Sequence, residues 1–207
     1  MARDTLIIFV RQPALGRVKR RLGAEIGATA ARRVYDALTR RAIVRLAGTR
    51  RWRTVLAVTP DRAAWRGWPR RLRRVGQGHG DLGARMARAL QTLAAPRAVL
   101  IGSDIPDVSP PVIARAFAAL GRARFVFGPA VDGGYWLIGW RRGAWPLAAL
   151  AGVRWSSPHA LADSRASLPA GHRVALVDRL ADLDDGAAYR AWRDRAGRVS
   201  GPDGVPG

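Results

Sequence analysis

The sequence predicts a single-domain α/β protein in which a mostly parallel central sheet is flanked by helices. Three observations lead to this fold class. The chain has 207 residues, which is enough for one domain with its own apolar core. Short apolar runs alternate with stretches of helical periodicity, the order that builds a parallel sheet. Most of these runs are apolar at nearly every position, as strands are when helices cover both faces of a sheet.

The expected elements follow one another in strand–helix order. Residues 23–47 repeat apolar side chains at helical spacing along one stripe. Asp81 is a good N-cap for the next helix, and Pro110 and Pro111 suit the first turn of the one after it. We expect strands at Thr5–Val10, Thr54–Thr59, Ala98–Gly102, Arg124–Gly128, Tyr135–Trp140 and Arg173–Val177, and helices at Gly23–Ala47, Leu82–Leu93, Pro110–Leu120 and Gly186–Arg195. Residues 1–196 should form the domain, and residues 197–207, rich in Gly and Pro, a flexible C-terminal tail.

Charge is the unusual feature, because 36 Lys and Arg against 15 Asp and Glu give a formal net charge of +21. Every cation except Lys19 is an arginine, and every acid except Glu25 is an aspartate. This bias is typical of GC-rich codon usage, and the arginines are spread along the whole chain. We therefore expect weak nonspecific binding to nucleic acid at low salt, and no specific nucleic-acid partner.

Composition also excludes several kinds of site. Without cysteine the chain has no disulfide, no zinc–thiolate centre and no cysteine nucleophile. The apolar run near the N-terminus is too short for a signal peptide, and no run approaches the ~20 residues that span a bilayer. We expect a soluble, cytoplasmic protein with no membrane partner.

The loop after the first expected strand has the character of a phosphate-binding segment. In α/β sheets the chemistry lies at the carboxyl ends of the strands, and Arg11 stands at such an end. Gly16 would let backbone amides approach a phosphate, and Lys19, the only lysine, would supply a compact charge. A basic turn that simply leads into a helix fits the spacing equally well. Neither a Walker A loop nor a G-x-G-x-x-G fingerprint is present.

Three aspartates are candidate ligands of Mg²⁺ or Mn²⁺, which prefer carboxylate oxygens and substrate phosphates. Asp104 follows the expected strand Ala98–Gly102. Asp182 and Asp184 stand two apart in an extended segment, so their side chains should point the same way. Two structural roles compete with this interpretation: a turn at Asp104 before a proline, and N-capping of the last helix by the acids near Asp185.

Two glycine-rich turns complete the set of candidates. Asp132-Gly-Gly is a strong hairpin signal, and the hairpin is the better local interpretation, but the Asp132 side chain would also face the same cleft. Gln77 and Gly78 precede the helix that Asp81 caps, and they would line a base or ribose pocket.

Taken in order, six segments of the chain resemble one bacterial family. They are LIIFVRQPALGRVKRRL, QGHGDLGARM, LIGSDIPDV, FGPAVDGGYWLIG, VRWSS and DLDD, and the similarity runs from about Thr5 to Asp185. The family is that of the selenodomain-associated transferases, also described as arsenosugar-biosynthesis-type glycosyltransferases. More distantly, the chain is similar to the phospholactate, phosphoenolpyruvate and molybdenum-cofactor guanylyltransferases.

The resemblance implies a Rossmann-like GT-A fold, the fold of nucleotide-diphospho-sugar transferases. It places Gly16 and Lys19 in the loop around the nucleotide phosphates and makes Asp104 the metal-binding acid. Asp182 and Asp184 match the acids that complete the metal site in the guanylyltransferases. The chain departs from the family at Arg20, where the family usually has threonine.

These observations together predict a metal-dependent glycosyltransferase that uses a nucleotide-sugar donor and a small-molecule acceptor. Lys19 and Arg11 would neutralise the departing nucleoside diphosphate, and Asp132 would be the base for the acceptor hydroxyl. The alternative is a nucleotidylyltransferase, in which a small phosphorylated or carboxylated substrate attacks a nucleoside triphosphate. The base, the sugar, the acceptor and the oligomeric state stay open at this stage.

Overall fold

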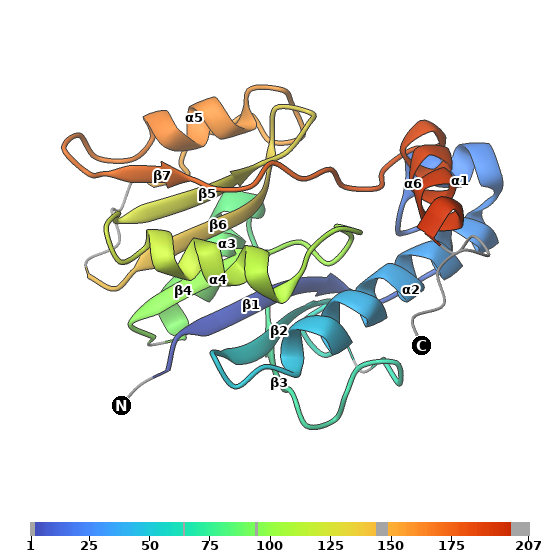
Figure 1. The fold of residues 1–207 in the computed structure, drawn as a ribbon, viewed down its shortest axis with the longest axis horizontal. Coiled ribbons are helices and arrows are strands. Elements are labelled where there is room, and N and C mark those ends of the chain that lie inside the picture. The colour runs from blue at the N-terminus through green and yellow to red at the C-terminus, as the bar shows by residue number, and fades with distance from the viewer. Residues whose placement is uncertain (1–2, 64, 94, 144–148, 200–207) are drawn as a thin grey trace.

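The computed structural model describes residues 3–63, 65–93, 95–143 and 149–199, and these form an α/β fold around one sheet. The strands are β1 Thr5–Arg11, β2 Arg53–Thr59, β3 Arg73–Gly76, β4 Arg97–Ile101, β5 Phe125–Pro129, β6 Tyr135–Arg141 and β7 Val174–Leu176. The helices are α1 Arg20–Ile26, α2 Ala28–Ala47, α3 Leu82–Thr92, α4 Pro110–Ala119, α5 Ala160–Ala166 and α6 Gly186–Val199. The sheet has the order β3-β2-β1-β4-β6-β5-β7 (Figure 1). Within it, β6 runs antiparallel to both neighbours and the other pairs are parallel, so the mostly parallel sheet is confirmed.

Helices cover both faces of the sheet, which explains why its central strands are apolar at nearly every position. Successive residues of β1 point to opposite faces. Leu6, Ile8 and Val10 pack against side chains of α2 and α4, whereas Ile7 packs against α3. Figure 1 shows α4 in front of the sheet and α3 behind it. Two apolar layers therefore cover the sheet, one on each side, and a third cluster around Leu22 and Leu183 joins α1 and α2 to the segment before α6.

The structure differs from the expected elements at three places. The long helix predicted from Gly23 is divided at Gly27, whose φ of 85° lies outside the helical region. Strand β3 and helix α5 were not predicted, because β3 is short and carries two arginines and α5 has only seven residues. The last helix continues to Val199, past the expected start of the tail, and residues 200–207 lie outside the described part of the chain.

The predicted hairpin at Asp132 is confirmed, and it is what makes β6 antiparallel. One carboxylate oxygen of Asp132 accepts a hydrogen bond from the Gly134 amide at 2.9 Å. Gly133 has a φ of 85°, a conformation that favours glycine. No helix in the described ranges is both long and apolar enough to cross a bilayer.

The sheet order determines where a ligand can bind. From β1 the chain passes through α1 and α2 to β2 on one side, while β4 pairs with β1 on the other. A crevice forms at the carboxyl ends of two such strands, where the connections leave in opposite directions. Lys19 follows β1 and Asp104 follows β4, so both belong to this crevice.

Candidate active site

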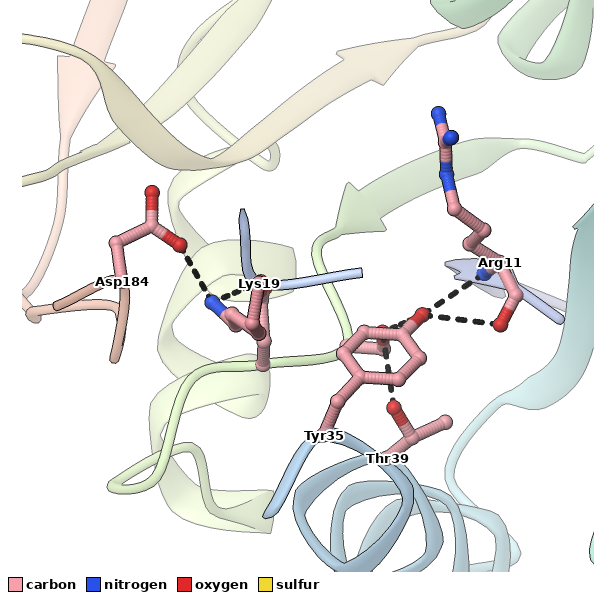
Figure 2. A network of polar contacts seen from close by, with 7 residues as sticks. Arg11, Lys19, Tyr35, Thr39 and Asp184 are labelled. Atoms are coloured by element: carbon pink, nitrogen blue, oxygen red, sulfur yellow. Dashed lines mark hydrogen bonds and ion pairs between the residues drawn. The ribbon is translucent and has the colours of Figure 1, made fainter. Parts of the chain in front are cut away.

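Lys19 is the centre of an ion-pair cluster at the carboxyl ends of β1 and β4. Its Nζ lies 2.6 Å from Oδ2 of Asp104 and 2.6 Å from Oδ1 of Asp184. The Lys19 side chain is only 3% exposed, whereas those of Asp104 and Asp184 are 28% and 49% exposed. Figure 2 shows the ammonium directed at Asp184. The cluster joins three segments that are far apart in the sequence.

The backbone around Lys19 directs its side chain inward. Gly16 and Lys19 both have positive φ values, 69° and 49°, so the loop turns sharply before α1 begins. The Leu22 amide then donates to the carbonyl oxygen of Asp184 at 3.1 Å, which ties α1 to the segment before α6. Asp185 caps α6 by accepting from the Ala188 amide at 2.8 Å, so the predicted capping role is confirmed.

The electrostatics of the cluster follow from burial and from neighbouring charges. Burial alone would lower the pKa of Lys19, but the carboxylates of Asp104 and Asp184 outweigh it and the pKa is raised. Burial, and then the negative charge of Asp184, raise the pKa of Asp182 to about 6. Asp104 and Asp132 act on Asp182 in the same direction. The sequence-predicted acids therefore interact electrostatically, although only two of them contact Lys19.

A buried hydroxyl network holds the ends of β1 and β4 together beside the cluster. The Tyr35 hydroxyl accepts from the Arg11 amide at 2.9 Å and lies 3.1 Å from the Arg11 carbonyl oxygen. It also lies 3.3 Å from Oγ of Ser103, to which the Thr39 hydroxyl donates (Figure 2). Because Ser103 precedes Asp104, this network positions the carboxylate that binds Lys19. Burial raises the pKa of Tyr35, which keeps the hydroxyl protonated.

Gln77 lies in the wall of the site with every hydrogen-bonding group engaged. The amide nitrogen donates to the carbonyl oxygens of Ala57 at 2.9 Å and Val10 at 3.4 Å. The amide oxygen accepts from Nη1 of Arg85 at 3.0 Å. The Gly78 amide donates to a carboxylate oxygen of Asp61 at 2.9 Å. Both residues therefore make hydrogen bonds within the protein, and their expected place in a base or ribose pocket stays a prediction.

These groups surround a cavity of about 260 Å³ at the crevice. Of the predicted site residues, Arg11, Lys19, Gln77, Asp104 and Asp184 line it. The remaining ones, Gly16, Gly78, Asp132 and Asp182, are not in its wall. The other residues that line the cavity are Phe9, Val10, Arg17, Val18, Tyr35, Thr59, Leu82, Arg85, Gly102 and Ser103.

Sequence reasoning missed two functional candidates in this wall, Tyr35 and Arg85. Arg85 lies four residues after Asp81, inside the segment that carries the family resemblance, and that position was an available signal. Tyr35 comes from the middle of α2, and nothing in the sequence relates it to the end of β1.

The donor chemistry of the cluster fits a hard divalent cation such as Mg²⁺ or Mn²⁺, because its acids offer carboxylate oxygens beside a cationic pocket. In the described ranges, no three histidine, aspartate or glutamate side chains are arranged to hold a metal ion. Lys19 instead contacts both Asp104 and Asp184. A metal ion held by these acids would therefore require their contacts with Lys19 to change.

Comparison with solved structures identifies the fold. A candidate nucleotide-diphospho-sugar transferase from Desulfovibrio desulfuricans G20 is 25% identical, with a TM-score of 0.79 and coverage of 96% of this chain and 97% of that one. A 4-diphosphocytidyl-2C-methyl-D-erythritol synthase from Anaerococcus prevotii is 10% identical, with a TM-score of 0.57 and coverage of 95% and 97%. Glucosyl-3-phosphoglycerate synthase from Mycobacterium tuberculosis, in complex with Mn²⁺, UDP and phosphoglyceric acid, is 11% identical, with a TM-score of 0.57 and coverage of 98% and 80%. The expected nucleotide-diphospho-sugar transferase fold is thus confirmed.

Comparison at the level of sequence finds fewer matches. No curated protein matches the chain. The narrower resemblance to the selenodomain-associated transferases stays a prediction. The model of the DUF2064 family, described as an uncharacterized protein conserved in bacteria, matches residues 42–157, which is more than half of the chain. The chain therefore belongs to the DUF2064 family.

Proposed function

We propose that the protein is a metal-dependent glycosyltransferase of the arsenosugar-biosynthesis type, which transfers a sugar from a nucleotide donor to a small-molecule acceptor. One observation carries the proposal. Lys19, Asp104 and Asp184 meet at the carboxyl ends of β1 and β4, in a cavity that Arg11 also lines. In this fold that edge of the sheet is where a nucleotide ligand is expected.

The chain's own residues divide the chemistry between them. Lys19 and Arg11 are placed to neutralise the charge that develops on a departing nucleoside diphosphate. Asp104, with Asp182 or Asp184, would hold Mg²⁺ or Mn²⁺, which supplies Lewis-acid stabilisation of the diphosphate when bound. No protein nucleophile is needed for such a transfer.

Asp132 is our candidate for the general base. Its side chain is exposed in the β5–β6 turn, where one carboxylate oxygen accepts a hydrogen bond from the Gly134 amide and the other accepts none from the residues that the structure describes. Its negative charge acts on Asp182, and a β-bridge joins Ala130, two residues before Asp132, to Leu180, two residues before Asp182. A base is required only when the acceptor hydroxyl attacks the sugar directly.

Nucleotidyl transfer is the second candidate, and the charge of the cavity favours it. Four cationic side chains line the cavity, Arg11, Arg17, Lys19 and Arg85, against the two acids Asp104 and Asp184, which leaves a net charge of +2 (4 − 2). This excess suits the longer phosphate chain of a nucleoside triphosphate. An oxygen of a small phosphate or carboxylate would attack the α-phosphate, and the bond to the β-phosphate would break to release pyrophosphate.

Calorimetric titration of nucleoside diphosphates and triphosphates, with and without Mn²⁺, tests the proposal. We expect Mn²⁺-dependent diphosphate binding in the wild type, and its loss in Asp104→Asn. Asp107→Asn is the matched control, since Asp107 lies in the same loop but is 55% exposed and outside the cavity. Metal-dependent binding of triphosphates alone, followed by pyrophosphate release, would replace the first function with the second. Absence of any metal-dependent nucleotide binding would refute both.

A further inference from the structure

Arg85 lies in the same cavity as Lys19 but takes no part in its ion-pair cluster. It comes from the first turn of α3 and is half-buried. Its Nη1 donates to the amide oxygen of Gln77 at 3.0 Å, and its Nε donates to the carbonyl oxygen of Asp81 at 3.3 Å. These two bonds orient the guanidinium plane. Within the described part of the chain, the N–H groups of Nη2 make no hydrogen bond, so one edge of the guanidinium is available to a ligand.

Gln77 keeps Arg85 in this orientation. Its side chain is 3% exposed, and its amide nitrogen is engaged by two backbone carbonyls, of Ala57 and Val10. Those bonds determine which way the amide faces, so the oxygen is directed at Arg85. An amide with all its groups engaged is poorly suited to bind a nucleotide, but it is well suited to position a neighbour.

Arg11 supplies a second cation to the same wall. In the ranges that the structure describes, neither Arg11 nor Arg85 forms an ion pair with a carboxylate. Figure 2 shows the Arg11 side chain extending away from the Tyr35 hydroxyl that holds its backbone. Burial, and then the positive charge of Arg11, lower the pKa of Arg85. The Asp81 carboxylate, which attracts Arg85, caps α3 by accepting from the Ala84 amide at 2.8 Å. The two arginines therefore repel each other in a cavity whose carboxylates are engaged by Lys19.

We propose that Arg85 and Arg11 form a subsite for a phosphate group of the nucleotide, with Gln77 as the residue that positions Arg85. The subsite rests on the proposed function, since it takes a nucleotide as the ligand. The nucleotide would then have two phosphate contacts, one from Arg85 in α3 and one from the loop that carries Lys19. A phosphate relieves the repulsion between the two arginines, and the free guanidinium edge matches two phosphate oxygens at once.

Titration of inorganic pyrophosphate and of the four common nucleoside diphosphates tests the subsite, at physiological ionic strength because the chain is strongly basic. We expect Arg85→Met to weaken both pyrophosphate and diphosphate binding about tenfold or more. Arg85→Lys keeps the charge without the fork and should lose less. Arg41→Met is the matched control: it removes one charge from the exposed face of α2, outside the cavity, and should change affinity less than about twofold.

Gln77→Met tests whether Gln77 positions Arg85 for binding or only stabilises the fold. If Gln77 acts through Arg85, Gln77→Met lowers pyrophosphate affinity, and the double variant with Arg85→Met binds no more weakly than Arg85→Met alone. Thermal unfolding of each variant confirms that it is folded. Additive losses in the double variant would show that Gln77 does not act through Arg85.

The outcomes also distinguish the subsite from the proposed function. If Arg85→Met leaves pyrophosphate binding unchanged but loses nucleotide binding, Arg85 contacts the nucleoside and the subsite is wrong. If neither changes while Lys19→Met abolishes both, the subsite is wrong and the proposed function stands. A loss in Arg41→Met equal to that in Arg85→Met would mean that only net charge matters, which also refutes the subsite. If wild-type protein binds pyrophosphate but no nucleotide, the proposed function fails.

Discussion

Replacing Lys19 with methionine is the sharpest test of the ion-pair cluster. The variant keeps the buried stem but removes the ammonium that contacts Asp104 and Asp184, each at 2.6 Å. Two carboxylates would then face each other without a counter-charge. We expect the folded state to lose stability and the site to gain affinity for a free divalent cation.

The exposure of the partners sets the magnitude. Removing one member of a fully buried ion pair costs about 3–5 kcal/mol, which is an upper bound. Asp104 and Asp184 are 28% and 49% exposed and regain part of their hydration when Lys19 is lost. Methionine also avoids the desolvation of an ammonium. We therefore expect a loss of about 2 kcal/mol in the free energy of unfolding, which lowers Tm by about 4–8 °C in a chain of this size.

Urea unfolding at pH 7.5 of a double-mutant cycle with Asp184→Asn measures the interaction directly. In the wild-type background Asp184→Asn should be destabilising; in the Lys19→Met background it should be neutral or stabilising, because it removes a repulsion. Mn²⁺ should raise the Tm of Lys19→Met more than that of the wild type, because Asp104 and Asp184 no longer pair with the Lys19 ammonium in the variant. An equal cost of Asp184→Asn in both backgrounds would refute the ion-pair account, and an equal Mn²⁺ response would refute the link to the metal site.

Three further variants probe the surroundings of the cluster. Because the folded-state pKa of Asp182 is about 6 against an ordinary 3.8, the contribution of this group to stability is lost as pH rises between these values; Asp182→Asn should match the wild type in urea unfolding at pH 3.5 and exceed it at pH 8, and a constant difference would contradict the shift. Gly133→Ala would place a Cβ against the Pro158 carbonyl at a φ of 85°, and we expect a loss of at least about 2 kcal/mol, while Gly152→Ala, with a similar φ but open space, should lose less. Tyr35→Phe removes the hydroxyl between Arg11 and Ser103 and should cost about 1–2 kcal/mol in the same assay; a cost near zero would mean that the hydroxyl network does not stabilise the end of β1.

The central strands were predictable because a single local property identifies them. Residues 5–10, 54–59 and 98–101 are almost wholly apolar, and a parallel sheet under two helical layers requires this pattern. Strand β3 breaks the pattern because it lies at an edge of the sheet and exposes Arg73. The break in the first helix depended on the backbone of Gly27, which a period of apolar residues does not report.

The cluster itself could be predicted only as separate candidates. Lys19, Asp104 and Asp184 each follow or precede a recognisable element, but their contact spans up to 165 positions of sequence and depends on the sheet order. The expected hairpin at Asp132 and the cap at Asp185 needed only local rules, and both are confirmed. Local hydrogen bonding is therefore readable from the sequence where distant pairing is not.

Arginine usage explains why the remaining part of the cavity was missed. In a chain that uses arginine for all but one of its 36 basic residues, composition gives no reason to select Arg85. Lys19 could be selected because it is the only lysine in the chain. Its compact ammonium lets it contact two carboxylates although its side chain is only 3% exposed. What distinguishes Arg85 is that a buried amide orients it beside Arg11 in a cavity whose acids are already engaged. In a strongly basic protein, the informative cations are thus those that buried polar neighbours orient inside a cavity without pairing them with an acid.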